Sequence, residues 1–295
     1  MGLRVATHYA TFHADDVLAW AMLSTFLAED AELVRTRDPE ILAQADIVFD
    51  VGGVFDIETC RFDHHQQSYG GDLSSAGMVL NWLEGRGSVT PQLATDLRLS
   101  LVDYVDEVDT GRRQPQRAVP CFAGLVDAHT KGCETLAEFD EAFHRAADMA
   151  RGVLRGLVRE HEARRRNRQW MAAAMEDAVA RDSNLILLSH WFDWKAPYYD
   201  LGGSEHTTEF VIQPDLNGLT WRAVAIPPER GSFGKKVPLP LEWAGLVDEE
   251  LAEVCGVPGA KFCHKNRFIA VFDSREGALS ALTRARLIRG RLSSP

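Results

Sequence analysis

The hydrophobic and polar positions in the first part of the chain predict alternating strands and helices. Residues 3–8 alternate in polarity and contain β-branched side chains, which is typical of a short strand. Residues 14–27 place hydrophobic side chains on one helical face. Further short strands are expected at residues 31–35, 45–51 and 59–62. This alternation predicts an α/β fold with a mainly parallel sheet flanked by helices.

The pattern changes after residue 134 and again after residue 182. Residues 135–182 are helical in pattern, and short strands return beyond them, followed by a closing helix at 274–289. We therefore expect an α/β domain at 1–134, a helical connector at 135–182, and a smaller α+β domain at 183–295. The connector could also be an interface between copies, which leaves a homodimer open.

Composition limits the function classes. The chain has 295 residues and a net charge of −11, which argues against a protein that coats duplex nucleic acid through a basic face. It does not exclude a nucleic-acid substrate held by metal ions. Five cysteines form no Cys-x-x-Cys pair, and the start of the chain lacks a signal peptide's apolar run. With no apolar window of about 18 residues, we expect a cytoplasmic protein without a membrane span.

Metal-capable side chains follow several predicted strands. His8 ends the first strand, and Asp50 lies near the end of the strand at 45–51, which a Gly-Gly pair that permits a tight turn follows. In open α/β sheets, ligand sites lie at the carboxyl ends of strands. The fourth expected strand, at 59–62, is followed by Asp63-His64-His65, a run that packing alone rarely requires. These positions predict a metal site.

The neighbouring helices add candidates. Asp15 and Asp16 lie in the first turn of a helix, where the dipole favours negative charge, so capping alone would explain that pair. Asp103, Asp106 and Asp109 crowd a helix carboxyl end, and a compensating positive group is expected beside them. The candidate metal ligands are His8, His13, Asp15, Asp50, His64 and one of Asp106 and Asp109.

This donor set predicts a particular chemistry. Imidazoles and carboxylates without thiolates suit Mn²⁺, Zn²⁺, Fe²⁺ or Co²⁺. Six ligands are too many for one tetrahedral ion, whereas two ions about 3.5–4 Å apart, bridged by a carboxylate such as Asp50, would use all six. Such a pair stabilises both attacking and leaving oxygens at phosphorus. The residues therefore favour phosphoester hydrolysis.

The order of these motifs resembles that of the DHH phosphoesterase superfamily. The narrower resemblance is to the branch named after the melanocyte proliferating gene product, a family of exonucleases. It is carried by the segments 7–16, 35–38, 50–53, 61–66, 105–111, 237–246 and 262–269, and so spans nearly the whole chain.

The resemblance implies a DHH-type catalytic domain and two bound divalent cations. Mn²⁺ is preferred, with Mg²⁺, Co²⁺ or Zn²⁺ as alternatives. It implies that His65 lies beside the scissile phosphate, that Asp63 orients it, and that Asp50 completes the catalytic set. Of the two late candidates, Asp106 is preferred over Asp109. The implied activity is 3′-to-5′ hydrolysis of single-stranded RNA or short oligonucleotides.

Two departures from the family pattern matter. Most superfamily members have Asp where His13 stands, so this site carries one negative charge fewer. Lys235-Lys236 stand where the branch often has Arg, which removes bidentate phosphate geometry. We expect a cationic wall facing the metals that binds phosphate or ribose, formed by His264, Lys265, Arg267, Lys235 and Lys236.

Two other functions remain open on the sequence. One is hydrolysis of a small phosphorylated metabolite, a cyclic dinucleotide or pyrophosphate. The other is a regulatory protein that binds metal without turnover.

Overall fold

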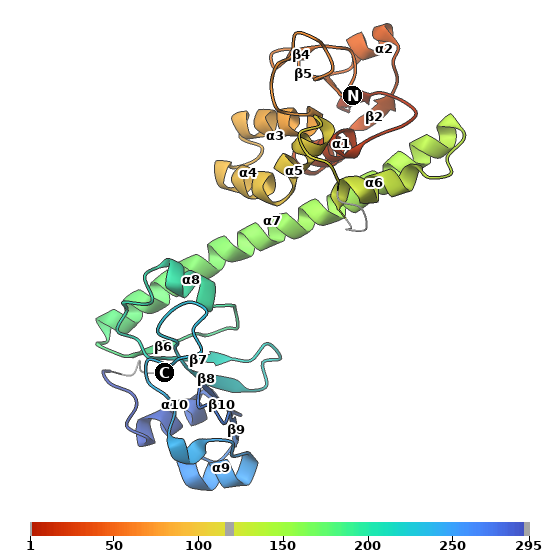
Figure 1. Ribbon diagram of the computed structural model, residues 1–295. Helices are drawn as coiled ribbons and strands as arrows, with labels where there is room; N and C mark the ends of the chain where they lie inside the picture. Colours follow the sequence, from red (N-terminus) through yellow and green to blue (C-terminus); the bar gives the residue numbers. More distant parts are fainter. Residues whose placement is uncertain (1, 116–120, 292–295) are drawn as a thin grey trace. The chain divides into compact units, whose positions relative to one another are not determined.

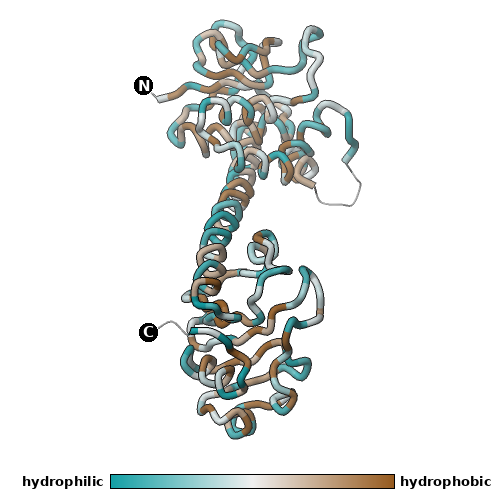
Figure 2. Tube along the Cα trace, turned by 90° about the vertical axis from the view of Figure 1, so that its left-hand side faces the viewer, coloured by the Kyte–Doolittle hydropathy of each residue, from teal (hydrophilic) through white to brown (hydrophobic). Residues whose placement is uncertain are grey.

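The structure is a computed structural model that describes residues 2–115 and 121–291 (Figure 1). The chain forms two compact units, Met1–His161 and Glu162–Pro295. The division falls within one helix, α7 (Leu136–Ala180), which occupies the segment expected as a connector. Its middle, around residues 159–168, is almost entirely hydrophilic (Figure 2).

A mainly parallel sheet organises the first unit. Its strands within the described residues are β1 (Arg4–Thr7), β2 (Glu32–Arg35), β3 (Ile47–Phe49), β4 (Phe55–Asp56) and β5 (Arg61–Phe62). They lie in the order β2-β1-β3-β5-β4, and only β4 runs antiparallel to its neighbour. The predicted α/β fold with a mainly parallel sheet is confirmed.

Helices cover one face of this sheet with a continuous core. They are α1 (Ala14–Phe26), α3 (Ser75–Gly85), α4 (Pro91–Leu97), α5 (Asp103–Asp109) and α6 (Phe122–Thr130). The strand residues Val5, Phe49 and Phe62 pack against them. Helix α1 is buried from Ala14 to Ser24, because it lies at the centre of this layer rather than at the surface.

The other face of the sheet has a much thinner cover. Helix α2 (Pro39–Gln44) is the element there, and it begins with Asp38 as cap and Pro39 in the first turn, two residue types that favour the start of a helix. Ala6, Val48 and Val51 form a small cluster with Leu42 of this helix. No residue of α2 is fully buried.

The helical segment from Pro91 to Asp109 is irregular. A π-helical turn, Arg98–Val102, separates α4 from α5. Such turns hold one extra residue and shift the face that later side chains present. Asp106 and Asp109 both lie beyond this turn.

The second unit contains a mixed sheet, which confirms the expected α+β character. In the part described, its strands are β6 (Leu185–Leu187), β7 (Phe210–Pro214), β8 (Trp221–Ala225), β9 (Ala260–Cys263) and β10 (Ile269–Phe272). Their order is β6-β7-β8-β10-β9, and only β6 and β7 pair in parallel. The helices are α8 (Lys195–Asp200), α9 (Asp248–Cys255) and α10 (Arg275–Arg284).

Candidate metal centre

The candidate ligands lie at the carboxyl edge of the first sheet. His8 follows β1, Asp50 follows β3, and the Asp63-His64-His65 run follows β5. Because these strands are parallel, their ends meet at one edge. Asp50 has a left-handed backbone with φ of 56°, which Asp tolerates better than most residues. This turn brings its carboxylate among the ligands contributed by the other strands.

His8 lies between two buried carboxylates. Its Nε2 atom is 3.1 Å from Oδ2 of Asp50 and 3.2 Å from Oδ2 of Asp16. Asp16 was expected only as a capping residue. Its Oδ1 atom does accept hydrogen bonds from the backbone N–H groups of His13 and Val17, at 2.9 and 2.8 Å. Asp16 therefore caps helix α1 with one oxygen and presents the other to the site.

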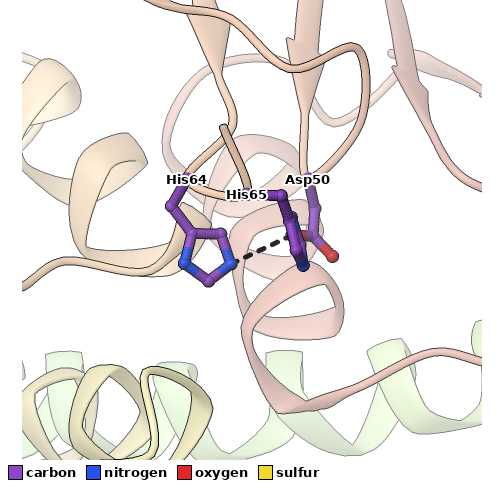
Figure 3. A group of neighbouring side chains, drawn as sticks. All are labelled: Asp50, His64 and His65. Atoms are coloured by element: carbon purple, nitrogen blue, oxygen red, sulfur yellow. Dashed lines mark ion pairs between the residues drawn. The ribbon is translucent and has the colours of Figure 1, made fainter. Parts of the chain in front are cut away.

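His64 approaches three carboxylates from the opposite side. Its Nε2 atom lies 3.0 Å from Oδ2 of Asp109, 3.5 Å from Oδ1 of Asp50 and 3.8 Å from Oδ2 of Asp15. Figure 3 shows His64 and Asp50 facing each other, with His65 beside them. Asp50 thus lies between His8 and His64.

Three groups of donor atoms could each hold a cation. In each, one atom per residue lies within 4.8 Å of the others. They are Asp50, His64 and His65; His8, Asp16 and Asp50; and His13, Asp15 and Asp109. Asp50 belongs to two of these groups, so its two oxygens could serve two neighbouring ions.

Unpartnered buried donors indicate that the site fits cations. Asp15 is 0% exposed, and neither of its carboxylate oxygens has a hydrogen-bond partner. Oδ2 of Asp16 is also buried, and it shares Nε2 of His8 with Oδ2 of Asp50. An ionised carboxylate without partners is unfavourable in a protein interior, whereas a divalent cation would satisfy it. The donor set and its burial therefore fit a metal centre.

The pKa shifts in the site reflect this concentration of negative charge. Burial, together with Asp50 and Asp109, raises the pKa of the Asp15 carboxyl well above its usual range. Burial alone would lower the pKa of His8, but Asp16 and Asp50 raise it to about 10. Asp109 and Asp50 likewise raise the pKa of His64 to about 10 against the effect of burial. Imidazoles that hold protons this strongly show that the cluster attracts positive charge.

Asp63 holds His65 in place. Its Oδ2 atom accepts a 2.6 Å hydrogen bond from Gly53 N–H, and its Oδ1 atom accepts from the backbone N–H of His65. The same Oδ1 is 2.8 Å from Nδ1 of the His65 ring. This side chain is 60% exposed, so its Nε2 atom is available to a substrate.

Asp109 lies in one of the three donor groups and Asp106 in none of them, whereas the sequence preferred Asp106; which acid is the ligand stays a prediction. Oδ1 of Asp106 accepts hydrogen bonds from Ser74 N–H, Ser74 Oγ–H and Gly77 N–H at the start of α3. Asp109 instead belongs to the donor group of His13 and Asp15. Both acids have the positive partner that the sequence led us to expect. Asp106 has the backbone N–H groups at the start of α3, and Asp109 has the imidazole of His64.

Two further contributors were missed by the sequence analysis. The hydroxyl of Ser75 lies 3.1 Å from Oδ1 of Asp50 and 2.9 Å from the Phe62 carbonyl. Arg35 donates to the carbonyls of His8 and Ala10, in the loop that carries His8 and His13. Of these two residues, only Arg35 could have been identified from the sequence, because it begins the segment 35–38 that carries part of the family resemblance.

The predicted cationic residues belong to the second unit. The Nζ atom of Lys236 already donates to Tyr198 Oη, the Gly203 carbonyl and the His206 carbonyl, at 2.6–3.1 Å. These contacts indicate a structural role for Lys236. Lys265 is exposed, His264 accepts from Asn266 N–H, and Arg267 donates to the Leu239 carbonyl. Lys235 is partly buried. A role for these residues in substrate binding stays a prediction.

The fold and the site define a metal-binding α/β protein whose donors gather at the carboxyl edge of a parallel sheet. Comparison with known sequences places it more closely. The chain belongs to the MYG1 exonuclease family, described as "Uncharacterised protein family (UPF0160)", whose profile matches residues 4–286.

Curated relatives of similar length support the assignment. The MYG1 protein of Chlamydia trachomatis is 37% identical over 283 residues, which covers 94% of both chains. The MYG1 exonuclease of Homo sapiens is 35% identical over 320 residues, covering 94% of this chain and 84% of the human one. The MYG1 protein C694.04c of Schizosaccharomyces pombe is 32% identical over 323 residues, covering 96% and 97%.

The solved structures are more distant. RecJ from Thermus thermophilus in complex with Mn²⁺ gives a TM-score of 0.29 at 16% identity, covering 97% of this chain and 52% of RecJ. The chain therefore spans about half the length of that protein. A TM-score this low is not evidence of a shared fold, so the family assignment depends on the sequence relatives.

Proposed function

We propose that this chain is a two-metal phosphoesterase that removes nucleotides from single-stranded RNA or short oligonucleotides in the 3′-to-5′ direction. One observation carries the proposal: the fully buried Asp15 carboxylate, without hydrogen-bond partners, lies in a donor group with His13 and Asp109. The name of the mammalian relatives, MYG1 exonuclease, supports the reaction class. The resemblance to DHH phosphoesterases supports the same class.

Two of the three donor groups would hold the ions in this proposal. The first ion would be held by His8, Asp16 and Asp50, and the second by His13, Asp15 and Asp109, with His64 beside Asp50. Bound divalent ions, of which Mn²⁺ is the preferred candidate, supply Lewis-acid stabilisation of charge at phosphorus and an activated water.

His65 would contact the phosphate directly. Its Nδ1 atom is engaged by Asp63, so its Nε2 atom would donate a hydrogen bond to a non-bridging phosphate oxygen. Asp63, fixed by Gly53 N–H, would keep the ring in that orientation. Ser75 would hold the Asp50 carboxylate in place through Oδ1.

A shorter substrate is the second candidate. The cavity beside the donors has a volume of about 410 Å³ and is lined by residues such as Thr11, Gln66 and His65. That size lies within the range of small-molecule pockets, about 300–1,000 Å³. It favours a dinucleotide or another small phosphoester over a long strand held along its length.

An assay of labelled single-stranded RNA and of a dinucleotide, in Mn²⁺, tests the proposal. Asp50→Ala should lower turnover by about 1,000-fold or more, because several kcal/mol of metal stabilisation are lost. Asp103→Asn, an exposed acid on the same helix as Asp109, should retain activity. Hydrolysis confined to the dinucleotide would establish the second candidate. Metal binding without hydrolysis of either substrate would contradict both.

Three attributes stay predictions from the sequence: the cytoplasmic location, the preference for RNA and the homodimer. No helix of the described residues is long and apolar enough to cross a membrane.

A further inference from the structure

A second cavity adjoins the metal pocket on the thinly covered face of the sheet. Its volume is about 440 Å³, and it lies between helix α2 and the strands β3 and β5. The two cavities share three lining residues: Arg37, Val51 and Gly52. A molecule held at the metal cluster could therefore extend past these residues without crossing the protein interior.

The lining of this cavity is mainly apolar. Leu42 and Ala43 of α2 contribute on one side, and Val48, Val51 and Val54 on the other. Parallel sheets are normally covered on both faces. Here a six-residue helix without a fully buried residue covers this face of β1 and β3. Val48 and Val51 are buried beneath it, but Val54 is exposed and Leu42 is partly exposed.

Arg37 has the one polar side chain among the three residues that line both cavities. It is exposed, its guanidinium lies 5.9 Å from the centre of the Tyr9 ring, and it has no carboxylate partner among the residues that the structure describes. Arg61, which lines only the second cavity, differs because its guanidinium donates to backbone carbonyls such as those of Thr59 and Ala45. Arg37 therefore keeps its planar set of donors for an anion.

We propose that the second cavity binds the nucleoside attached to the phosphate at the metal cluster, and that Arg37 binds an oxygen of that phosphate. The nucleobase would lie against Leu42, Val51 and Val54. This proposal rests on the proposed function, because it assumes a nucleotide at the metals. It assigns substrate recognition to the first unit itself.

The chemistry of the lining favours a nucleoside over other occupants. A free phosphate would bind Arg37 but would make no contact that requires the apolar wall. A nucleobase has apolar faces and polar edges, which match the valine and leucine side chains and the two arginines at the margin. Because Arg37, Val51 and Gly52 line both cavities, a base in the second cavity could stay attached through its ribose to a phosphate in the first.

The test fills the cavity without touching a metal ligand. Ala43→Trp places a large side chain in the cavity, and Gln44→Trp, at the next exposed position of α2 and outside the lining, is the matched control. We expect Ala43→Trp to raise the KM for an RNA oligonucleotide about tenfold, as loss of one base contact does, with kcat nearly unchanged. Gln44→Trp should leave both parameters as in the wild type.

Calorimetric titration with adenosine 5′-monophosphate in Mn²⁺ gives a readout that does not depend on turnover. Ala43→Trp should weaken its binding about tenfold, and Gln44→Trp should not. Arg37→Gln should weaken binding more than Arg37→Lys, because only lysine keeps the charge. Since Arg37 is exposed, these two variants are expected to fold even if Ala43→Trp does not.

The outcomes separate this proposal from the function it rests on. RNA hydrolysis with an unchanged KM in Ala43→Trp and Arg37→Gln would overturn the subsite and leave the nuclease in place. The opposite result is also possible: the wild type binds the nucleotide but does not hydrolyse RNA, and Ala43→Trp and Arg37→Gln bind the nucleotide more weakly. That result would uphold the subsite and overturn the function. A wild-type dimer that Ala43→Trp converts to a monomer in sedimentation would overturn the subsite, because a second copy would then cover the cavity.

Discussion

Arg35 and Asp140 form an ion pair of 2.7 Å that connects the metal-ligand loop to helix α7. The same guanidinium donates to the carbonyls of His8 and Ala10, at 3.1 and 2.8 Å. It also lies over the ring of Phe143 at 4.6 Å, and the side chain is only 4% exposed. Arg35 thus fixes the backbone on which two candidate ligands are carried.

Replacement of Arg35 by lysine should loosen the metal site without removing a ligand. Lysine keeps the charge but cannot reach both carbonyls and Asp140 with one planar group. We expect Mn²⁺ affinity to fall about 10- to 100-fold, as for other groups that orient ligands. Titration calorimetry with Mn²⁺ measures this. Asp140→Asn is the control: its side chain is about half exposed, so the ion pair itself contributes about 1 kcal/mol or less. Equal affinity in Arg35→Lys and the wild type would contradict the argument.

Replacement of Asp15 by asparagine should have opposite effects with and without metal. Asp15, Asp16, Asp50 and Asp109 repel one another when no cation is bound, so removing one charge should raise the melting temperature of the metal-free protein. Mn²⁺ at about 100 times its Kd should stabilise the wild type by about 2.7 kcal/mol. The variant should lose most of that gain. Thermal unfolding in EDTA and in Mn²⁺ gives both quantities, and a metal-free variant less stable than the wild type would be evidence against a metal centre here.

The two late acids should behave differently in metal binding. Asp109→Asn removes a donor next to His13 and Asp15, so the number of bound Mn²⁺ ions should fall from about two to about one. Asp106→Asn should keep both ions, since Oδ1 of Asp106 is occupied by the N–H groups of Ser74 and Gly77. Metal analysis after dialysis distinguishes them. A loss of metal in Asp106→Asn alone would restore the preference drawn from the sequence.

Substitution of His65 should separate turnover from metal binding. His65→Ala removes a donor aimed at the phosphate, which typically lowers kcat about 100- to 1,000-fold. The ions should remain, because two of the three donor groups do not include His65. Asp63→Asn should lower kcat less, since it disturbs only the orientation of the ring. Should His65→Ala release both ions, His65 would be a ligand instead.

The sheet, and the gathering of most candidate ligands at one of its edges, could be predicted because strand ends leave a direct signature. The residues after β1, β3 and β5 are His8, Asp50 and Asp63, and parallel strands bring their carboxyl ends together whatever the details of packing. The order of strands in the sheet was not needed for this inference. The inference required only that a residue able to bind a metal directly follows each apolar strand.

Helical positions were harder to predict, because rotation about the axis decides which acid reaches the site. The π-helical turn at Arg98–Val102 adds a residue before Asp106 and Asp109, so the periodicity of the preceding turns does not indicate which acid faces His64. Asp16 was missed for a related reason. Capping explains one of its oxygens, and the second points to His8 only because β1 lies beside α1.

Three short helices were not predicted, because a helix of about two turns is too short for its hydrophobic periodicity to be recognised. Helices α6, α8 and α9 have six to nine residues each, about two turns, and their patterns resemble those of loops. The cavity beside Arg37 could not be inferred at all. It exists because α2 is too short to cover the sheet face, and only the packed structure reveals that.

Asp106 should make the stability of the protein depend on pH in a defined direction. Burial raises the pKa of its carboxyl from 3.8 to about 6, despite hydrogen bonds from Ser74 and Gly77. Between these values the folded protein holds a proton that the unfolded chain has released. The contribution of the protonated Asp106 carboxyl to the free energy of unfolding is therefore present below about pH 4 and is lost as the pH rises through about 6.

Asp106→Asn removes this dependence while keeping an oxygen that accepts the same hydrogen bonds. Relative to the wild type, the variant should gain stability between about pH 4 and pH 6.5, by about 3 kcal/mol at most. Thermal unfolding in EDTA across this range measures the difference and avoids the pH dependence of metal binding. Asp103→Asn removes an exposed acid that contributes to the raised pKa of Asp106, so it should show only a smaller trend of the same sign. A difference between Asp106→Asn and the wild type that stays constant with pH would mean that Asp106 ionises as an ordinary carboxylate, with the N–H groups of α3 offsetting its burial.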